Sequence, residues 1–171
     1  MDILTAIKGR RSVRSFKDLP IETPLVETLK DALIWAPSAG NLQSRCFYFV
    51  FNEDVKKRLV RAALGQRFIS DAHMVVVGCA DLGIEDRYGR RGKELYCIED
   101  VALSIENMML AAFSLGLGAV WVGAFDEDGV AECLGLPRNL RPVAIVPVGY
   151  PLRIPPPPGR VSKEKAVIEV R

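Results

Sequence analysis

A short basic stretch near the start of the chain, IKGRRSVRSFKDLP at residues 7–20, holds the side chains with the clearest chemistry. Five basic residues lie between positions 8 and 17, with no acidic residue among them. Side chains alternate faces in an extended backbone, so Arg10, Ser12 and Arg14 are expected to point one way and Arg11 the other. Two guanidinium groups that flank a hydroxyl can hold a phosphate through charge-assisted hydrogen bonds. The stretch predicts a site for one compact anion; a solvated basic strand is the open alternative.

The charge of the whole chain argues against a polyanionic partner. There are 23 Lys and Arg residues against 21 Asp and Glu in 171 residues, a net charge of +2. A nucleic-acid-binding domain is usually far more basic, and here only Phe16 is interleaved with the arginines. A nucleic-acid-binding module is therefore the last of the functional hypotheses, and its binding would have to depend on salt.

The remaining composition indicates a cytoplasmic protein without a metal. No apolar run is long enough to cross a bilayer, and MDILTAIKGRRS does not have the pattern of a signal peptide. The four cysteines form no C-x-x-C motif, which suits reduced thiols. With His73 as the single histidine, no metal site is expected.

Other common catalytic motifs are absent or out of context. There is no G-x-S-x-G elbow and no P-loop. The glycines of GLGAVWVG at 116–123 follow a helix and open a strand, the reverse of a dinucleotide fingerprint. The sequence thus offers an anion site with few candidate acids, bases or nucleophiles. A cofactor that carries its own chemistry would explain that combination.

The elements that must position these residues alternate between helices and strands, which indicates an α+β or α/β sandwich. Helices are predicted at 2–9, 23–37, 52–64, 93–115 and 127–135. Strands are predicted at 46–51, 73–80, 118–124 and 141–151. Thr23 is expected to cap its helix and Asn52 the next one. The first two strands are expected to be buried on both faces, and residues 81–92 to form a mobile loop.

Two features point to a dimer of a single domain, with a core at 1–150 and an arm at 151–171. The apolar face of the 93–115 helix is too wide for one sheet, so this core helix is also expected to meet its copy. Four prolines at 155–158 predict a stiff polyproline arm. The terminal AVIEV at 166–170 is predicted to pair with a partner's sheet edge; a frayed tail or a PxxP ligand are the alternatives.

Four motifs in order, RRSVRSF, APSAGNLQ, GLGAVWVGAF and VAIVPVGYP, precede a proline-rich arm with Arg160. In these, the chain resembles the nitroreductase family of FMN-dependent oxidoreductases over nearly its whole length. The resemblance implies an α+β fold, with a central mixed β-sheet flanked by helices. It also implies a homodimer in which the C-terminal arm is exchanged between subunits and FMN lies in two interface clefts.

The resemblance assigns the cofactor contacts in three groups. The FMN phosphate, ribityl chain or pyrimidine edge would be held by Arg10, Arg11, Ser12, Arg14 and Arg160. The flavin ring would be lined from the other subunit by Pro37, Ser38, Ala39, Asn41 and Gln43. The ring's remaining contacts would come from Gln66, Val122, Gly123 and Ala124. The backbone N–H of Gly123 would donate to flavin N5, so no catalytic side chain is expected.

The implied activity is a ping-pong cycle, in which NADH or NADPH reduces the flavin and a small acceptor then takes the electrons. The acceptor would be a nitroaromatic, a quinone or an activated alkene. Tyr88 and Phe125 are candidates for the acceptor pocket, with core packing as the open alternative. A flavin-binding carrier or sensor with little turnover is the alternative function.

Overall fold

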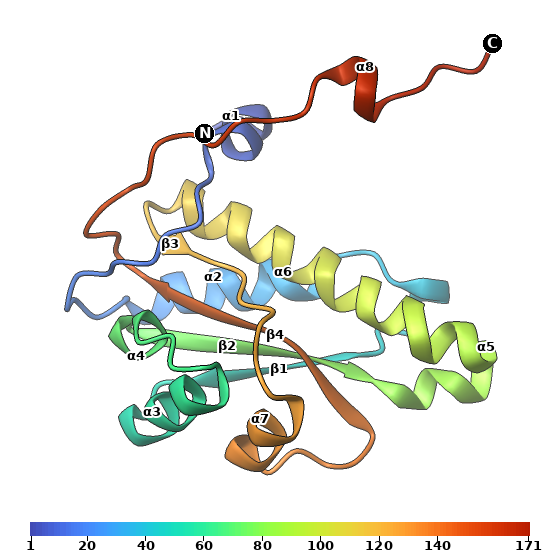
Figure 1. Ribbon diagram of the computed structural model, residues 1–171, viewed down its shortest axis with the longest axis horizontal. Coiled ribbons are helices and arrows are strands. Elements are labelled where there is room, and N and C mark those ends of the chain that lie inside the picture. The colour runs from blue at the N-terminus through green and yellow to red at the C-terminus, as the bar shows by residue number, and fades with distance from the viewer.

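The computed structural model describes all 171 residues as a four-stranded sheet covered by helices (Figure 1). The strands are β1 (Arg45–Val50), β2 (Met74–Asp81), β3 (Gly118–Ala119) and β4 (Leu140–Gly149), in the order β1-β2-β4-β3. All three ladders are antiparallel, and the only parallel contact is an isolated bridge between Ser12 and Ala119. The predicted α+β class is confirmed, although the sheet is mixed only at that bridge.

Eight α-helices and three helical turns of the 3-10 or π type accompany these strands. The helices are α1 (Ile3–Gly9), α2 (Thr23–Ile34), α3 (Glu53–Ala62), α4 (Phe68–Asp71), α5 (Glu85–Arg91), α6 (Cys97–Ser114), α7 (Glu127–Leu134) and α8 (Lys163–Ala166). The helical turns are η1 (Ala39–Asn41), η2 (Leu82–Ile84) and the π-helical η3 (Gly92–Tyr96). None of these helices is both long and apolar enough to cross a membrane.

The core lies on both faces of the sheet (Figure 1). On one face α2 and α6 pack their apolar side chains against β2 and β4. On the other face the same two strands meet α3 and α7. The seven residues from Met74 to Ala80 are therefore all buried, as predicted for this strand.

Two local predictions are wrong, one for the burial of β1 and one for the start of α2. β1 is an edge strand, and only Val50 among its residues is buried, because no neighbouring strand covers its outer side. The helix at 23 begins one residue earlier than expected, since Glu22 holds the N-cap position and Thr23 is already helical. The Asn52 cap is confirmed: its side-chain oxygen accepts from the N–H groups of Asp54 and Val55, both at 3.0 Å.

Residues 81–92 form η2 and α5 in place of the predicted loop. Acidic residues in the first turn of α5 and basic residues in its last turn complement the helix dipole. Gly89 interrupts the helix at φ 57° and ψ −155°, a conformation that only glycine adopts easily. The predicted strand at 118–124 is also shorter, with only Gly118–Ala119 in a ladder and Val122 in an isolated bridge.

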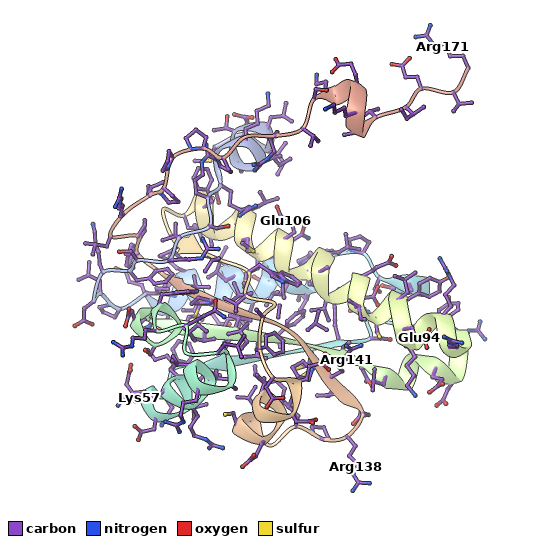
Figure 2. The ribbon with its side chains drawn as sticks, viewed as in Figure 1. Lys57, Glu94, Glu106, Arg138, Arg141 and Arg171 are labelled. Atoms are coloured by element: carbon purple, nitrogen blue, oxygen red, sulfur yellow. The ribbon has the colours of Figure 1, made fainter.

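The C-terminal arm leaves the core after Pro151 and extends away from it, ending at Arg171 (Figures 1 and 2). Nearly every residue from Leu152 onward is exposed, and Ile168 and Val170 are 78% and 93% exposed. In the single chain, AVIEV forms no strand. Its pairing with a partner's sheet stays a prediction.

Candidate functional site

The basic row at the N-terminus and the proline-rich arm meet across one cavity of about 270 Å³. Its lining residues are Arg10, Arg11, Ser12, Arg14, Pro155, Pro156, Pro158 and Arg160. None of them is acidic, so the cavity is strongly cationic. Figure 1 shows the arm rising beside the N-terminal segment, which is how two ends of the chain reach one site.

The basic row is fixed to the sheet through the residue between its two outer members. The N–H of Val13 donates to the carbonyl of Ala119 at 3.0 Å, and the Val13 side chain is buried. A Cβ on Gly118 would lie only 2.8 Å from that side chain, so a larger residue at 118 would displace the row. The glycine and the valine together set the position of the flanking arginines.

The first two arginines of the row have different environments. Arg10 has a buried Nε with no hydrogen-bond partner, 3.6 Å from an Oε1 of Glu106 on α6 (Figure 2). This Nε therefore forms an ion pair with Glu106 but no hydrogen bond within the chain. Arg11 donates from one terminal nitrogen to the carbonyls of Lys8, Gly9 and Arg10 at 2.7–2.9 Å, capping α1.

Strict alternation of the row is not observed. Arg11 was expected to face away from Arg10, yet both line the cavity, because the row is extended only at isolated bridges. Arg14 lies over the ring of Phe68 at 5.9 Å from the centroid. A second cavity of about 250 Å³ shares Ser12 and Arg14 and adds Arg153, a basic residue that the sequence reasoning missed.

The segment after β3 is anchored at several points but leaves the backbone N–H of Gly123 without a partner. Val122 exchanges two hydrogen bonds with Ile145, at 2.9 and 3.0 Å. The side-chain amide of Gln66 donates to the carbonyl of Ala124 at 3.0 Å, and a further bond joins Asp126 to α3. Gly123 lies between these anchors, is exposed, and its N–H has no partner. The segment is thus anchored on both sides of an exposed residue whose N–H is free to donate.

The loop at 37–43 is the third predicted group, and a single chain does not bring it to the arginines. The basic row precedes α2 and the loop follows it, at the other end of the molecule (Figure 1). Residues 40–43 are exposed. Arg45 clamps the start of the loop by donating to the carbonyls of Ile34, Ala36 and Pro37 at 2.8–3.1 Å.

A buried carboxylate on α6 was not anticipated as part of this loop. Asp100 is 2% exposed, and its Oδ1 accepts from the N–H of Ala39 at 2.9 Å. The two residues are 61 positions apart, so the only signal in the sequence is an acidic residue beside the apolar seam of the long helix.

Of the two acceptor-pocket candidates, Tyr88 packs its hydroxyl against Gly40, whereas Phe125 packs against the α3–α7 core.

Burial sets the protonation of two groups that could otherwise take part in chemistry, Cys79 and His73. Burial raises the pKa of Cys79 to about 12, so its thiol stays protonated at neutral pH. Burial, with a further effect of the Lys56 charge, lowers the pKa of His73. No group of three or more His, Cys, Asp or Glu side chains is placed to hold a metal ion.

The sequence profile of the nitroreductase family matches residues 7–86 and 61–150. The chain belongs to the nitroreductase family. This nitroreductase-family chain is 31% identical, over 91% of its own length and 80% of the relative's, to a Methanothermobacter thermautotrophicus protein. That protein is named as both an NADH dehydrogenase and an NAD(P)H nitroreductase. The chain is also 28% identical to the oxygen-insensitive NADPH nitroreductase of Salmonella typhimurium, over 94% of this chain and 70% of that one.

Solved structures agree with this assignment. The family member superposes on nitroreductase A of Vibrio parahaemolyticus with a TM-score of 0.92 and 27% identity, over 100% of this chain and 77% of that one. It superposes on the NADPH:FMN oxidoreductase of Vibrio harveyi with a TM-score of 0.91 and 26% identity, over 99% and 77%. The chain is therefore an NAD(P)H-dependent oxidoreductase of the nitroreductase family.

Proposed function

We propose that the protein is a homodimer that binds FMN between its subunits and uses NADH or NADPH to reduce a small acceptor. The acceptor class is a nitroaromatic, a quinone or an activated alkene. Relatives carry the names NAD(P)H nitroreductase and FMN reductase, which supports this chemistry. The four free cysteines suit the cytoplasm, where we place the enzyme.

The cationic cavity is the observation that carries the proposal. A flavin mononucleotide ends in a compact phosphate, and Arg10, Arg14 and Arg160 line a cavity that has no acidic lining residue, although Arg10 also pairs with Glu106. The Nε of Arg10 is buried beside Glu106, so the terminal nitrogens of its guanidinium would be the donors to the phosphate. Each hydrogen bond from a guanidinium to phosphate stabilises binding by roughly 1.5–3 kcal/mol. Ser12 and Arg11, which also line the cavity, would complete the phosphate and ribityl contacts.

A second copy of the chain would supply the other wall of the site. The apolar side chains Ile3, Leu4, Ile7, Trp35 and Leu103 are exposed on α1, on α6 and at the end of α2, and Trp35 is 82% exposed. Monomers rarely expose so much apolar surface. With this face covered by a partner, the loop residues Pro37, Ser38, Ala39, Asn41 and Gln43 would line the partner's flavin. The arm at 151–171 would clasp the partner's 1–150 core.

Backbone geometry would assist the reaction without a catalytic side chain. The chemistry supplied by bound FMN is reversible hydride uptake, which lets NADH or NADPH and the acceptor use the site in turn. Gly123 would donate its free N–H to flavin N5. Val122 and Ala124 would pass along the reactive edge, and Gln66 would hold Ala124 in place.

The test compares flavin retention in matched double variants. Arg10→Ala/Arg14→Ala removes two cavity cations, and Lys57→Ala/Arg138→Ala removes the same charge far from the cavity (Figure 2). We expect the parent and the control to purify yellow with FMN, identified by chromatography of the released chromophore. The cavity variant should lose affinity for FMN by about 100-fold or more, since two charged contacts are removed.

Anaerobic addition of NADH or NADPH then separates the enzyme from a carrier. Bleaching of the flavin band, and its return when a quinone is added, support an oxidoreductase with this cofactor. A colourless parent that does not respond to added FMN, or a cavity variant as yellow as the parent, contradicts the proposal.

A further inference from the structure

The loop at 37–43 adopts an unfavourable backbone that the rest of the chain must hold in place. Gly40, Asn41 and Gln43 all have φ of 54–55°, in the left-handed region. For Asn41 and Gln43, which carry side chains, this conformation is energetically unfavourable. Such residues persist only where their surroundings fix them, and they cluster at functional sites. The exposed residues 40–43 would otherwise relax to an ordinary turn.

One hydrogen bond joins the 37–43 loop to the central helix α6. Ser38 and Gln43 bond to each other within the loop, Ser38 Oγ accepting from the Gln43 N–H at 3.0 Å. Arg45 holds the end of α2, which fixes the start of the loop. The N–H of Ala39, at the centre, donates to Oδ1 of Asp100 on α6 at 2.9 Å. Asp100 therefore supplies the hydrogen bond that joins the loop to α6, where Ala39 also packs against the core.

The cost of burying this carboxylate argues for a role beyond packing. Asp100 is 2% exposed, its Oδ1 has the Ala39 N–H as partner, and its Oδ2 is buried without any hydrogen bond. A half-satisfied buried carboxylate lowers stability relative to a small apolar residue of a helix core. The positive charge of Arg45 interacts with the carboxylate of Asp100 over a distance, but the two side chains form no ion pair. A penalty of this kind is retained where it sets a geometry that function needs.

We infer that Asp100 is a positioning residue for the flavin of the partner subunit: it holds the left-handed 37–43 loop in the shape that lines the ring. The inference rests on the proposed function for the identity of the ligand. Its structural part concerns this chain alone, because the loop is held by Asp100 whether or not a flavin is present. Asp100 touches no substrate in this account and acts only through the loop.

The experiment measures the loop and the cofactor separately. The variants are Asp100→Ala, which removes the acceptor, and Asp100→Asn, which keeps an oxygen for the Ala39 N–H. The matched control is Ser104→Ala, which removes a buried hydrogen bond to the Asp100 carbonyl one turn along α6 without touching the loop. Hydrogen exchange of the Ala39 amide in flavin-free protein reports on the loop. Titration with FMN, and the visible spectrum of the complex, report on the site.

We expect Asp100→Ala to speed exchange at Ala39 by roughly tenfold or more, as for loss of a charge-assisted hydrogen bond. FMN affinity should fall by a similar factor, with a shifted flavin band. Asp100→Asn should recover most of both, and Ser104→Ala should match the parent even if it melts at a lower temperature. Unchanged exchange at Ala39 in a folded Asp100→Ala variant overturns the inference.

The outcomes also separate this inference from the proposed function. If exchange at Ala39 rises but the parent itself binds no FMN, the positioning of the loop stands and the proposed cofactor fails. If exchange rises while FMN affinity and spectrum stay unchanged, the loop does not line the flavin and the inference is wrong, although FMN binding survives.

Discussion

The role proposed for the segment after β3, a contact to flavin N5, depends on the N–H group of Gly123. The neighbours on both sides are fixed by bonds to Ile145 and Gln66, so this donor is exposed, unpaired and unable to turn away. A preorganised donor costs no reorganisation when charge develops beside it, and removal of one such donor typically slows an enzyme by about 10²-fold or more.

Gly123→Pro therefore tests the donor directly. Proline removes the N–H, and the preceding Val122 is already paired with β4, in the extended form that proline prefers before it. We expect the rate of flavin reduction by NADH or NADPH in stopped-flow experiments to fall by about 10²-fold. Gly123→Ala is the control, because it keeps the N–H and places its Cβ 3.2 Å from the Trp121 indole nitrogen. Equal rates in the two variants would remove the role assigned to this N–H.

At the scale of elements, α3 is joined to the start of β2 by a buried lysine. Lys56 is 2% exposed, donates to the carbonyl of Ala72 at 2.7 Å and pairs with Glu53 at 2.7 Å. The adjacent His73 has a pKa below its usual 6.5, first because of burial and then because of the Lys56 charge. Its neutral form is thus the one that the folded state favours.

This junction predicts a dependence of stability on pH. Because the folded pKa of His73 is lowered, its contribution is complete above the unfolded value near 6.5 and is lost as the pH falls through the folded value. His73 is the only histidine, so its ring signals in NMR can be followed without ambiguity. We expect a titration midpoint below 6.5, and a falling free energy of unfolding over the same range that is absent in His73→Phe. A midpoint at or above 6.5 would contradict this account.

The secondary-structure elements also show which parts of the fold could be predicted from the sequence. Local signals were sufficient for the Asn52 cap and for the buried run of β2, where neighbouring residues in the sequence decide the structure. They failed where a partner distant in the chain decides. β1 reads as a buried strand because its composition does not reveal that it lies at an edge. The tie between Asp100 and Ala39 joins residues 61 positions apart, and no local pattern predicts such a contact.

At the scale of the whole molecule, the arm ends in apolar side chains that its own chain leaves uncovered. Ile168 and Val170 alternate with the charged Glu169 and Arg171, the pattern of a strand with one apolar face. An exposed segment with this pattern favours association with another sheet edge. We proposed above that a partner covers it.

Ile168→Asp/Val170→Asp places two charges on that face. If the arm clasps a partner, the variant should shift toward monomer in sedimentation velocity and lose FMN as the interface site opens. Glu169→Lys, on the alternate face, is the control and should remain dimeric. A double variant that sediments as the parent does would show that the tail stays free in solution.

The four prolines before this tail restrict where its end can travel. A stiff polyproline segment extends by about 3.1 Å per residue, so residues 155–158 act as a spacer of roughly 12 Å. A flexible spacer of the same length would spread the tail over a larger volume and dilute it at its target. If the tail docks on a partner as proposed, the prolines reduce the entropy lost on docking, so that assembly would be favourable at lower protein levels than with a glycine-rich arm.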